Sequence, residues 1–215
     1  MILLVAHTKG GVGKSTLAWN IAHSLKVHGE NVKIIDLDFQ QTLFFVNSIA
    51  AKRNQETIEV LQPKTGSELL EIINNYDGYI VIDAGGFDND INRIALSNAT
   101  KILVPISPSA VEVIGFMTFE TILNDVNATA VNLVLNNIHP LQRDFTDIQN
   151  AVSHNGIKLL NTIVRSRKTY KDVMGLGKSV FEHTDLKATA EIEELKNELF
   201  WYWWCNKREN QNNWG

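Results

Sequence analysis

A glycine-rich loop with two lysines stands between a short apolar run and a segment with a helical pattern. The apolar run is Ile2–Ala6, and the loop reads T-K-G-G-V-G-K-S-T over residues 8–16. Glycines lack a Cβ, so successive backbone N–H groups can turn inward around phosphate oxygens, and the N-terminus of the following helix favours the same anion. The pattern predicts a strand–loop–helix unit that binds a nucleotide through Lys9, Gly10, Gly11, Val12, Gly13, Lys14, Ser15 and Thr16.

Two side chains of this loop carry the expected chemistry. Lys14 is placed to neutralise the β- and γ-phosphates of the nucleotide, and the Ser15 hydroxyl is placed to ligate Mg²⁺. The alternative interpretation is a surface turn rich in glycine and lysine. The strand before the loop and the helix after it favour the phosphate-binding interpretation.

The loop departs from the usual pattern, which has glycine where this chain has Thr8 and then a second lysine, Lys9. If Lys14 occupies the phosphate position, Lys9 has no place on its own nucleotide. It is then free to reach a phosphate held by a second subunit.

The run K-G-G-V-G-K-S resembles the deviant Walker A motif of the ParA/MinD superfamily. Nearly the whole chain resembles the small ParF-type partition proteins of that superfamily. In that family the first lysine is the signature of ATP-dependent sandwich dimers. The resemblance implies that the cofactors are ATP and Mg²⁺, and that Lys9 and Lys14 take part in catalysis.

The length and composition of the chain limit its domain organisation, the metal and disulfide sites it can build, and its location in the cell. With 215 residues, 44% of them hydrophobic, the chain is long enough for one α/β domain, which we expect over residues 1–204 with a polar tail over 205–215. Cys205 is the only cysteine, so one subunit cannot build a disulfide, a thiolate zinc site or an iron–sulfur cluster. The N-terminal apolar run is too short for a signal peptide, and no window approaches the ~18 apolar residues of a membrane span, so we expect a cytoplasmic protein.

Six apolar runs alternate with amphipathic or turn-rich segments. Their near-continuous apolarity is typical of strands buried on both faces, and they cover Ile2–Ala6, Val32–Ile35, Tyr79–Ile82, Ile102–Pro105, Val131–Leu135 and Leu159–Val164. The alternation predicts a doubly wound α/β fold, with a mostly parallel sheet and helices on both faces. Ligands of such folds bind at the carboxyl ends of the strands.

Three aspartates follow two of these runs. Asp83 is expected to act on Mg²⁺ through water, as a Walker B aspartate does. Asp36 and Asp38 belong to D-L-D-F-Q, which is similar to the family's switch I, where the first aspartate joins the metal shell and the second activates the attacking water. Phe39 stands where the family has proline, which removes a residue of fixed φ. The alternative is that each aspartate caps a helix.

Two residues occupy positions that resemble those where proteins of this family contact adenine. Pro108 lies in P-I-S-P-S, which resembles the family's P-x-[ST]-P-S segment, and Asn136 follows a predicted strand. The alternatives are an ordinary strand-to-helix loop and an Asn-Asn turn.

A basic segment resembles the C-terminal part of ParF-type ATPases. It has one acid, Asp172, against five basic residues that we expect to bind DNA: Arg165, Arg167, Lys168, Lys171 and Lys178. Its local charge of +4, in a chain of net charge −4, suits sequence-independent phosphate contact. The alternatives are a solvated basic face and a positive lip of the nucleotide site.

The C-terminus is rich in tryptophan. Leu195, Leu199, Phe200 and Trp203 are spaced to continue the last amphipathic helix onto the core. Partner docking and a MinD-like membrane anchor are the other interpretations.

The resemblance implies a ParA-type ATPase, with slow and partner-stimulated hydrolysis of ATP. Such a protein forms a homodimer with ATP, binds nonspecific DNA on the nucleoid, and partitions plasmid or chromosomal DNA with a small adaptor protein. The alternatives are a MinD-like ATPase that cycles on the membrane, an ATPase that positions a cargo other than DNA, and a phosphoryl-transfer enzyme like dethiobiotin synthetase.

Overall fold

A seven-stranded sheet forms the centre of the computed structural model, which describes residues 1–86, 88–152 and 157–212, and side chains only as far as residue 200, residue 110 excepted. The strands follow the order β3-β2-β4-β1-β5-β6-β7, and every pairing is parallel. Their bounds are β1 Ile2–Val5, β2 Val32–Asp36, β3 Glu59–Leu61, β4 Tyr79–Asp83, β5 Lys101–Ile106, β6 Val131–Ile138 and β7 Lys158–Arg165. The predicted parallel α/β fold is confirmed.

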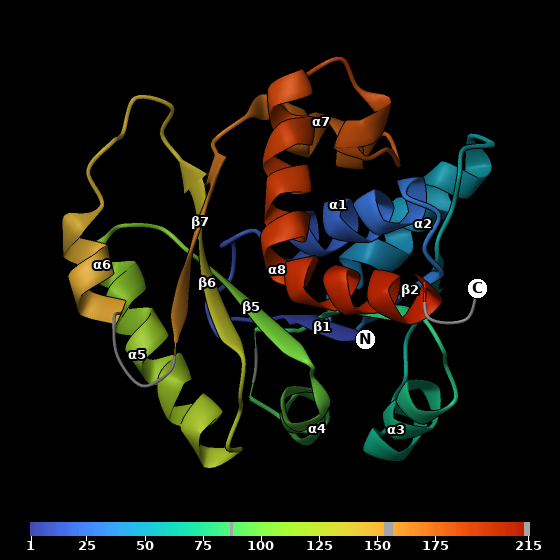
Figure 1. Cartoon of the computed structure of the whole chain (residues 1–215), viewed down its shortest axis with the longest axis horizontal. Helices are drawn as coiled ribbons and strands as arrows, with labels where there is room; N and C mark the ends of the chain where they lie inside the picture. Colours follow the sequence, from blue (N-terminus) through green and yellow to red (C-terminus); the bar gives the residue numbers. More distant parts are fainter. Residues whose placement is uncertain (87, 153–156, 213–215) are drawn as a thin grey trace.

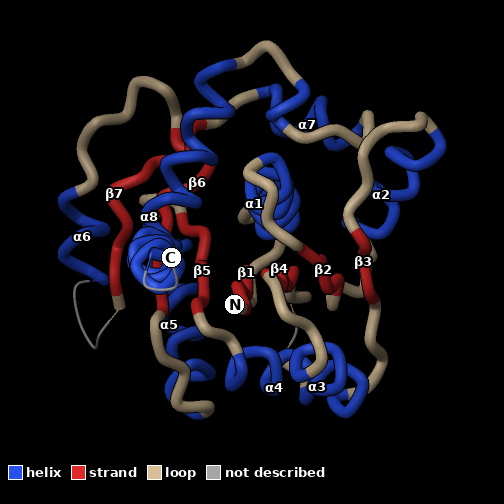
Figure 2. Tube along the Cα trace, turned by 45° about the vertical axis from the view of Figure 1, so that its right-hand side comes forward, coloured by secondary structure: helices blue, strands red, loops and turns tan. Residues whose placement is uncertain are grey.

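Helices cover both faces of the sheet (Figure 1, Figure 2). One apolar core lies beneath α1 Lys14–Val27, α2 Thr42–Lys52, α7 Lys168–Gly175 and α8 Leu186–Asn212. The other lies beneath α3 Gly66–Asn74, α4 Asp90–Asn98, α5 Ala110–Asp125 and α6 Thr146–Val152. A single 3₁₀ turn, η1 Val180–Glu182, joins α7 to α8 among the described residues. This arrangement is the doubly wound form that the alternation of the sequence predicts.

Six strands lie where the sequence predicts them, within a few residues at each end. β3 was not predicted, because it has only three residues and none of them is fully buried. A strand so short at the sheet edge lacks the continuous apolar run that marks the others.

The strand order places three carboxyl ends side by side. β4 lies between β2 and β1, so Asp36 and Asp83 occupy paired positions on neighbouring strands. β1 and β5 also neighbour each other, and the chain order reverses between them. The loop after β1 therefore lies at the topological switch point, where ligands of such sheets bind.

The C-terminal helix packs on the first core. Leu195, Leu199 and Phe200 are buried, and the ring of Phe200 meets that of Tyr79 edge-on at 5.4 Å between centroids. Core packing is confirmed for these three residues, whereas the side chain of Trp203 lies outside the described residues. The division at residue 204 stays a prediction. Among the described helices, we find none with the length and apolarity that membrane crossing requires.

Candidate functional site

The glycine loop connects β1 to α1 in a conformation that glycine alone tolerates easily. Gly11 and Gly13 have φ angles of 76° and 95°. A Cβ on Gly13 would lie 2.3 Å from Nδ2 of Asn136, and this same nitrogen donates a hydrogen bond to the carbonyl of Val12 at 2.7 Å. Asn136, which we expected to contact adenine, therefore supports the loop directly.

Lys14 is buried at the start of α1. Its Nζ donates to the carbonyl of Lys9 at 3.0 Å, so the lysine closes the loop on itself. Burial lowers the pKa of Lys14, and the carboxylates of Asp83 and Asp38 oppose the shift. An anion bound in the loop would stabilise the charged form of Lys14, because it replaces the interactions with water that burial removes.

Asp83 is completely buried at the end of β4. Burial raises its pKa to about 8, Asp36 and Asp38 add to the shift, and the neighbouring Ser15 hydroxyl and Lys14 oppose it. A buried carboxylate next to a hydroxyl suits a divalent cation, which would favour the ionised form. The oxygen chemistry of Ser15 and Asp83 thus fits Mg²⁺.

Asp36 has a different set of contacts. Its Oδ2 accepts hydrogen bonds from the backbone N–H groups of Leu43 at 3.0 Å and Phe44 at 3.1 Å, and its Oδ1 accepts one from Asp38 at 3.2 Å. These bonds fix the loop after β2 to the start of α2. The contacts give Asp36 a positioning role, and its place in a metal shell stays a prediction.

Asp38 lies on a turn at the edge of a large cavity. Its Oδ1 accepts from the N–H of Gln40 at 2.8 Å, and its carbonyl accepts from that of Gln41 at 2.9 Å. The cavity has a volume of about 850 Å³ and is lined by the glycine loop, by Lys14 and Ser15, by Asp38 and by parts of α2 and α7. Of the three predicted metal residues, Ser15 lines this cavity, whereas Asp36 and Asp83 are buried and do not line it.

Lys9 is absent from the lining of this cavity. Its Nζ forms an ion pair with Oε1 of Glu112 on α5, and its N–H donates to Nδ1 of His7 at 3.0 Å. Burial lowers the pKa of His7 to about 4, so this ring is a neutral acceptor. Lys9 is thus held at α5 in this structure, and both its absence from its own nucleotide and its donation to a second copy stay predictions.

Glu112 was missed in the sequence, although a local signal for its position was present. Ser109 caps α5 by accepting a hydrogen bond from the N–H of Glu112 at 3.3 Å. The pattern S-A-V-E is a capping-box signature, which places a glutamate in the first helical turn. Nothing in the pattern indicates that this glutamate meets Lys9.

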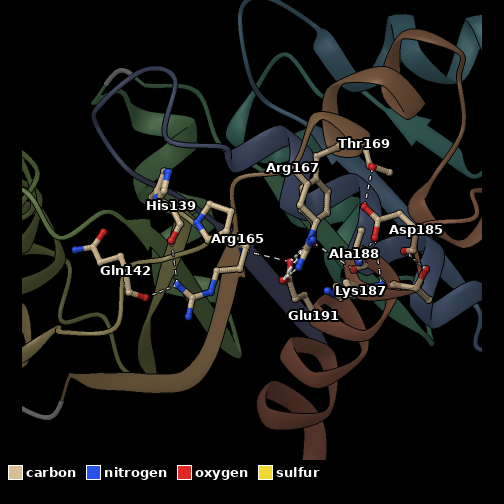
Figure 3. Close-up of polar contacts among 12 residues, drawn as sticks. His139, Gln142, Arg165, Arg167, Thr169, Asp185, Lys187, Ala188 and Glu191 are labelled. Carbon is tan, nitrogen blue, oxygen red and sulfur yellow. Dashed lines mark hydrogen bonds and ion pairs between the residues drawn. The ribbon is translucent and has the colours of Figure 1, made fainter.

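Several cations of the basic segment, residues 165–178, are bound to partners within the chain (Figure 3). Arg165 donates to the carbonyls of His139 at 3.2 Å and Gln142 at 2.8 Å. Arg167 pairs with Glu191 of α8 at 2.5 Å, and Lys168 pairs with Asp172 at 2.9 Å. The fold therefore brings Glu191, which lies outside the segment, against one of its five cations.

A second cavity, of about 150 Å³, lies between the glycine loop and this segment. It is lined by Gly11, Val12, Gly13, Thr16, Asn136, Asn137, Val164, Arg165, Arg167, Tyr170 and Lys171. Three of the five residues predicted to bind DNA thus lie beside the phosphate loop, as expected for a positive lip of the nucleotide site. Lys168, Lys178 and Pro108 line neither cavity.

Comparison with known proteins agrees with this geometry. A family model described as the CobQ/CobB/MinD/ParA nucleotide binding domain matches residues 3–181. The Maintenance of carboxysome distribution protein A of Halothiobacillus neapolitanus is 27% identical over 208 residues, which is 92% of this chain and 95% of that protein. Protein ParA of Rhizobium radiobacter is 26% identical over 188 residues, 82% and 83% of the two chains. The structure of the MinD cell division protein of Aquifex aeolicus shares the fold, with a TM-score of 0.72 and 19% identity over 93% of this chain and 96% of that one.

Proposed function

The chain belongs to the CobQ/CobB/MinD/ParA nucleotide-binding family, and from this premise we propose that it is a ParA-type positioning ATPase. It binds ATP with Mg²⁺, forms a sandwich dimer around the nucleotides, and hydrolyses ATP slowly until a partner protein accelerates the reaction. The dimer binds DNA without sequence preference and positions plasmid or chromosomal DNA through a small adaptor. In this proposal the ATPase domain covers residues 1–204, and residues 205–215 lie beyond it, with α8 continuing across the boundary to Asn212.

One observation carries the proposal. Lys14, Ser15 and Asp38 line a single cavity of about 850 Å³ with the glycine loop, although β1, β2 and their loops are separate in the sequence. A pocket with a lysine, a hydroxyl and a carboxylate around backbone N–H groups matches the needs of phosphoryl transfer, in which catalysis is mainly positioning and charge stabilisation.

The residues take the following roles in this proposal. Backbone N–H groups of residues 10–16 hold the phosphates, and Lys14 neutralises the β- and γ-phosphate oxygens. Ser15 and, through water, Asp83 hold Mg²⁺, which supplies positive charge to the same oxygens when bound. Asp38 orients the attacking water from the turn that Asp36 fixes. Asn136 and Pro108 contact the adenine in this proposal, Asn136 through its Oδ1, since its Nδ2 donates to the carbonyl of Val12.

The state of Lys9 supports a role between two copies. The lysine lies outside the cavity of its own loop and is held at the start of α5. The same helix leaves Val111, Ile114 and Met117 exposed at helical spacing. Apolar side chains on the helix that holds Lys9 support contact with a second copy, which would cover them and receive the lysine.

DNA binding is the part of the proposal that depends most on dimerisation. Lys168 and Lys178 lie outside the cavities, while Arg165, Arg167 and Lys171 line the smaller one. Few cations per copy give weak phosphate contact, and two copies double the number of contacts on which salt-dependent affinity depends. ATP would then control DNA affinity, and residence on the nucleoid, by assembling the dimer.

A second candidate function is the positioning of a cargo other than DNA. The observation that favours it is the relative from Halothiobacillus neapolitanus, named for the maintenance of carboxysome distribution, which is similar over 92% of this chain. In this case the dimer still binds DNA as its track, and the adaptor links it to a different cargo. A MinD-like cycle on the membrane would instead need the C-terminal residues as an anchor.

The test combines light scattering with a DNA mobility assay. Asp38→Asn should slow hydrolysis about 100-fold or more, the lower range for loss of a positioned general base, and keep the ATP dimer assembled. We expect this variant to be dimeric with ATP and monomeric with ADP, and to shift unrelated DNA only with ATP, less so at higher salt. Asp147→Asn, an exposed change on α6, is the matched control. A variant that stays monomeric with ATP contradicts the sandwich dimer, and a shift that ignores nucleotide contradicts the switch.

A further inference from the structure

The two cavities beside the glycine loop have a common boundary. Gly11, Gly13, Thr16 and Lys171 line both of them. Three of these residues belong to the loop and the first turn of α1, whereas Lys171 comes from α7, more than 150 positions later in the sequence. Lys171 thus faces the phosphate loop across the boundary between the cavities.

Lys171 differs from its basic neighbours in its contacts. Arg165 is bound to backbone carbonyls, Arg167 to Glu191, and Lys168 to Asp172. The side chain of Lys171 is exposed, and its ammonium forms no hydrogen bond or ion pair with the residues that the structure describes. Its ammonium therefore remains available for an anion in the cavities.

The helix that carries Lys171 is anchored firmly next to the loop. The neighbouring Tyr170 is buried and donates from its hydroxyl to Oε2 of Glu191 at 3.0 Å. After α7, the carbonyl of Lys178 accepts a hydrogen bond from the buried indole of Trp19 on α1 at 2.9 Å.

The turn after α7 also approaches α2 closely. Gly177 has φ of 73°, and a Cβ there would lie 2.4 Å from the backbone nitrogen of Ala50. Contacts to α1, α2 and α8 hold the backbone of α7 beside the loop. The side chain of Lys171 therefore extends from a fixed helix opposite the phosphate loop, where a bound phosphate would order its ammonium.

We propose that Lys171 binds the α-phosphate of the nucleotide. This inference rests on the proposed function. The larger cavity contains Lys14, Ser15 and Asp38, which take the terminal phosphates, and the smaller one contains Asn136 and Asn137, whose amides suit a base edge. The group between them is the α-phosphate with its ribose, and of these two only the phosphate is charged. A lysine is a compact point charge, which suits a phosphate oxygen.

Lys171 then binds the nucleotide and does not belong to the DNA surface. Through Lys171, α7 contacts the bound nucleotide directly, and the same helix carries Lys168. Nucleotide in the pocket would therefore neutralise one cation of the basic segment while leaving Lys168 at the surface.

The test measures ADP affinity by titration calorimetry, because ADP carries the α-phosphate and needs neither hydrolysis nor dimerisation. Lys171→Ala should weaken ADP binding about tenfold, as expected for loss of one charged hydrogen bond of about 1.4 kcal/mol, and Lys171→Arg should retain most of the affinity. Lys168→Ala makes the same charge change on the same helix and should bind ADP like the wild type.

Two results would overturn the inference. One is ADP affinity that is unchanged in Lys171→Ala, above all if DNA affinity falls instead. The other is an equal loss in Lys168→Ala, which would mean that the general field of the segment acts and not a contact. If the wild type itself does not bind ADP, the proposed function fails, and this inference fails with it.

Discussion

The ammonium of Lys9 is paired within its own chain, with the carboxylate of Glu112 in the first turn of α5. Gly115, one turn further along α5, lies against the lysine stem, and a Cβ there would be 4.0 Å from Cδ of Lys9. The side chain of Lys9 is 37% exposed and that of Glu112 is 12% exposed. If Lys9 reaches the nucleotide of a second copy, it must first leave this carboxylate.

Replacing Glu112 with glutamine removes the opposing charge and keeps the shape of the side chain. We expect Glu112→Gln to form the ATP-dependent dimer at up to about fivefold lower protein concentration, because a partly exposed ion pair contributes at most about 1 kcal/mol. Light scattering over a dilution series with ATP measures the midpoint. Glu71→Gln, an exposed change on α3, is the control. A higher midpoint in Glu112→Gln would mean that the glutamate guides Lys9 to its partner and does not retain it.

The raised pKa of Asp83 leads us to expect that the free energy of unfolding depends on pH between about pH 4 and pH 8. The pKa of Asp83 rises from 3.8 to about 8 on folding, so between these values the native state holds a proton that the unfolded state releases. The free energy of unfolding of the wild type therefore falls as pH rises through this range. Asparagine is neutral throughout, and Asp83→Asn should melt about 10 °C or more above the wild type at pH 7.5. The rise in pKa from 3.8 to about 8 corresponds to a free energy on the order of 5 kcal/mol at this pH, and about 1 kcal/mol corresponds to roughly 2–4 °C in a domain of this size.

Calorimetry without Mg²⁺ or nucleotide is the appropriate measurement. The difference in melting temperature should shrink steadily from pH 7.5 toward pH 4. The same substitution should impair ATP hydrolysis with Mg²⁺, because the buried carboxylate is lost. A melting difference that is constant with pH would show that packing, and not ionisation, separates the two proteins.

Local patterns in the sequence predicted six of the seven strands that the structure describes, and the glycine-rich loop, because each depends on neighbours in the chain. Continuous apolar runs indicated β1, β2, β4, β5, β6 and β7, and the glycines indicated the turn of the loop. The partners of the charged residues could not be predicted in this way. Glu112 meets Lys9 across 103 positions, and Glu191 meets Arg167 because α8 packs beside β7 and α7. The net charge of +4 counted for the basic segment therefore did not include the carboxylate of Glu191, which lies outside the segment in the sequence.

Glu191 connects the basic segment to α8 and should be important for stability. It accepts hydrogen bonds from the guanidinium of Arg167 and the hydroxyl of Tyr170, and from the N–H of Arg165 at 3.1 Å. Glu191→Gln leaves Arg167 without its counter-charge. We expect a loss of roughly 2 kcal/mol, below the 3–5 kcal/mol of fully buried pairs because Arg167 is partly exposed. Chemical denaturation measures the loss, with the exposed Glu194→Gln on α8 as the control. Equal stability of the two variants would mean that solvent already screens the pair.

Phe39 occupies the second position of the turn from Asp38 to Gln41, which is closed by the 2.9 Å hydrogen bond between these two residues. Proline is favoured at this position, since its fixed φ suits the turn. The ring of Phe39 is 82% exposed, so its removal sacrifices little apolar burial. The N–H of Phe39 donates no hydrogen bond within the part of the chain that the structure describes.

Phe39→Pro should therefore stabilise the protein by about 0.4–1 kcal/mol, through a smaller entropy of the unfolded chain. Asp38 keeps its bonds to Gln40 and Gln41, so the rate of ATP hydrolysis should not fall. Phe39→Ala removes the same ring without fixing φ, and its stability should stay within about 0.5 kcal/mol of the wild type. Thermal unfolding of the three proteins separates the effects. A melting temperature of Phe39→Pro below that of Phe39→Ala would mean that the turn needs a φ that proline cannot adopt, and that phenylalanine stands here for conformational reasons.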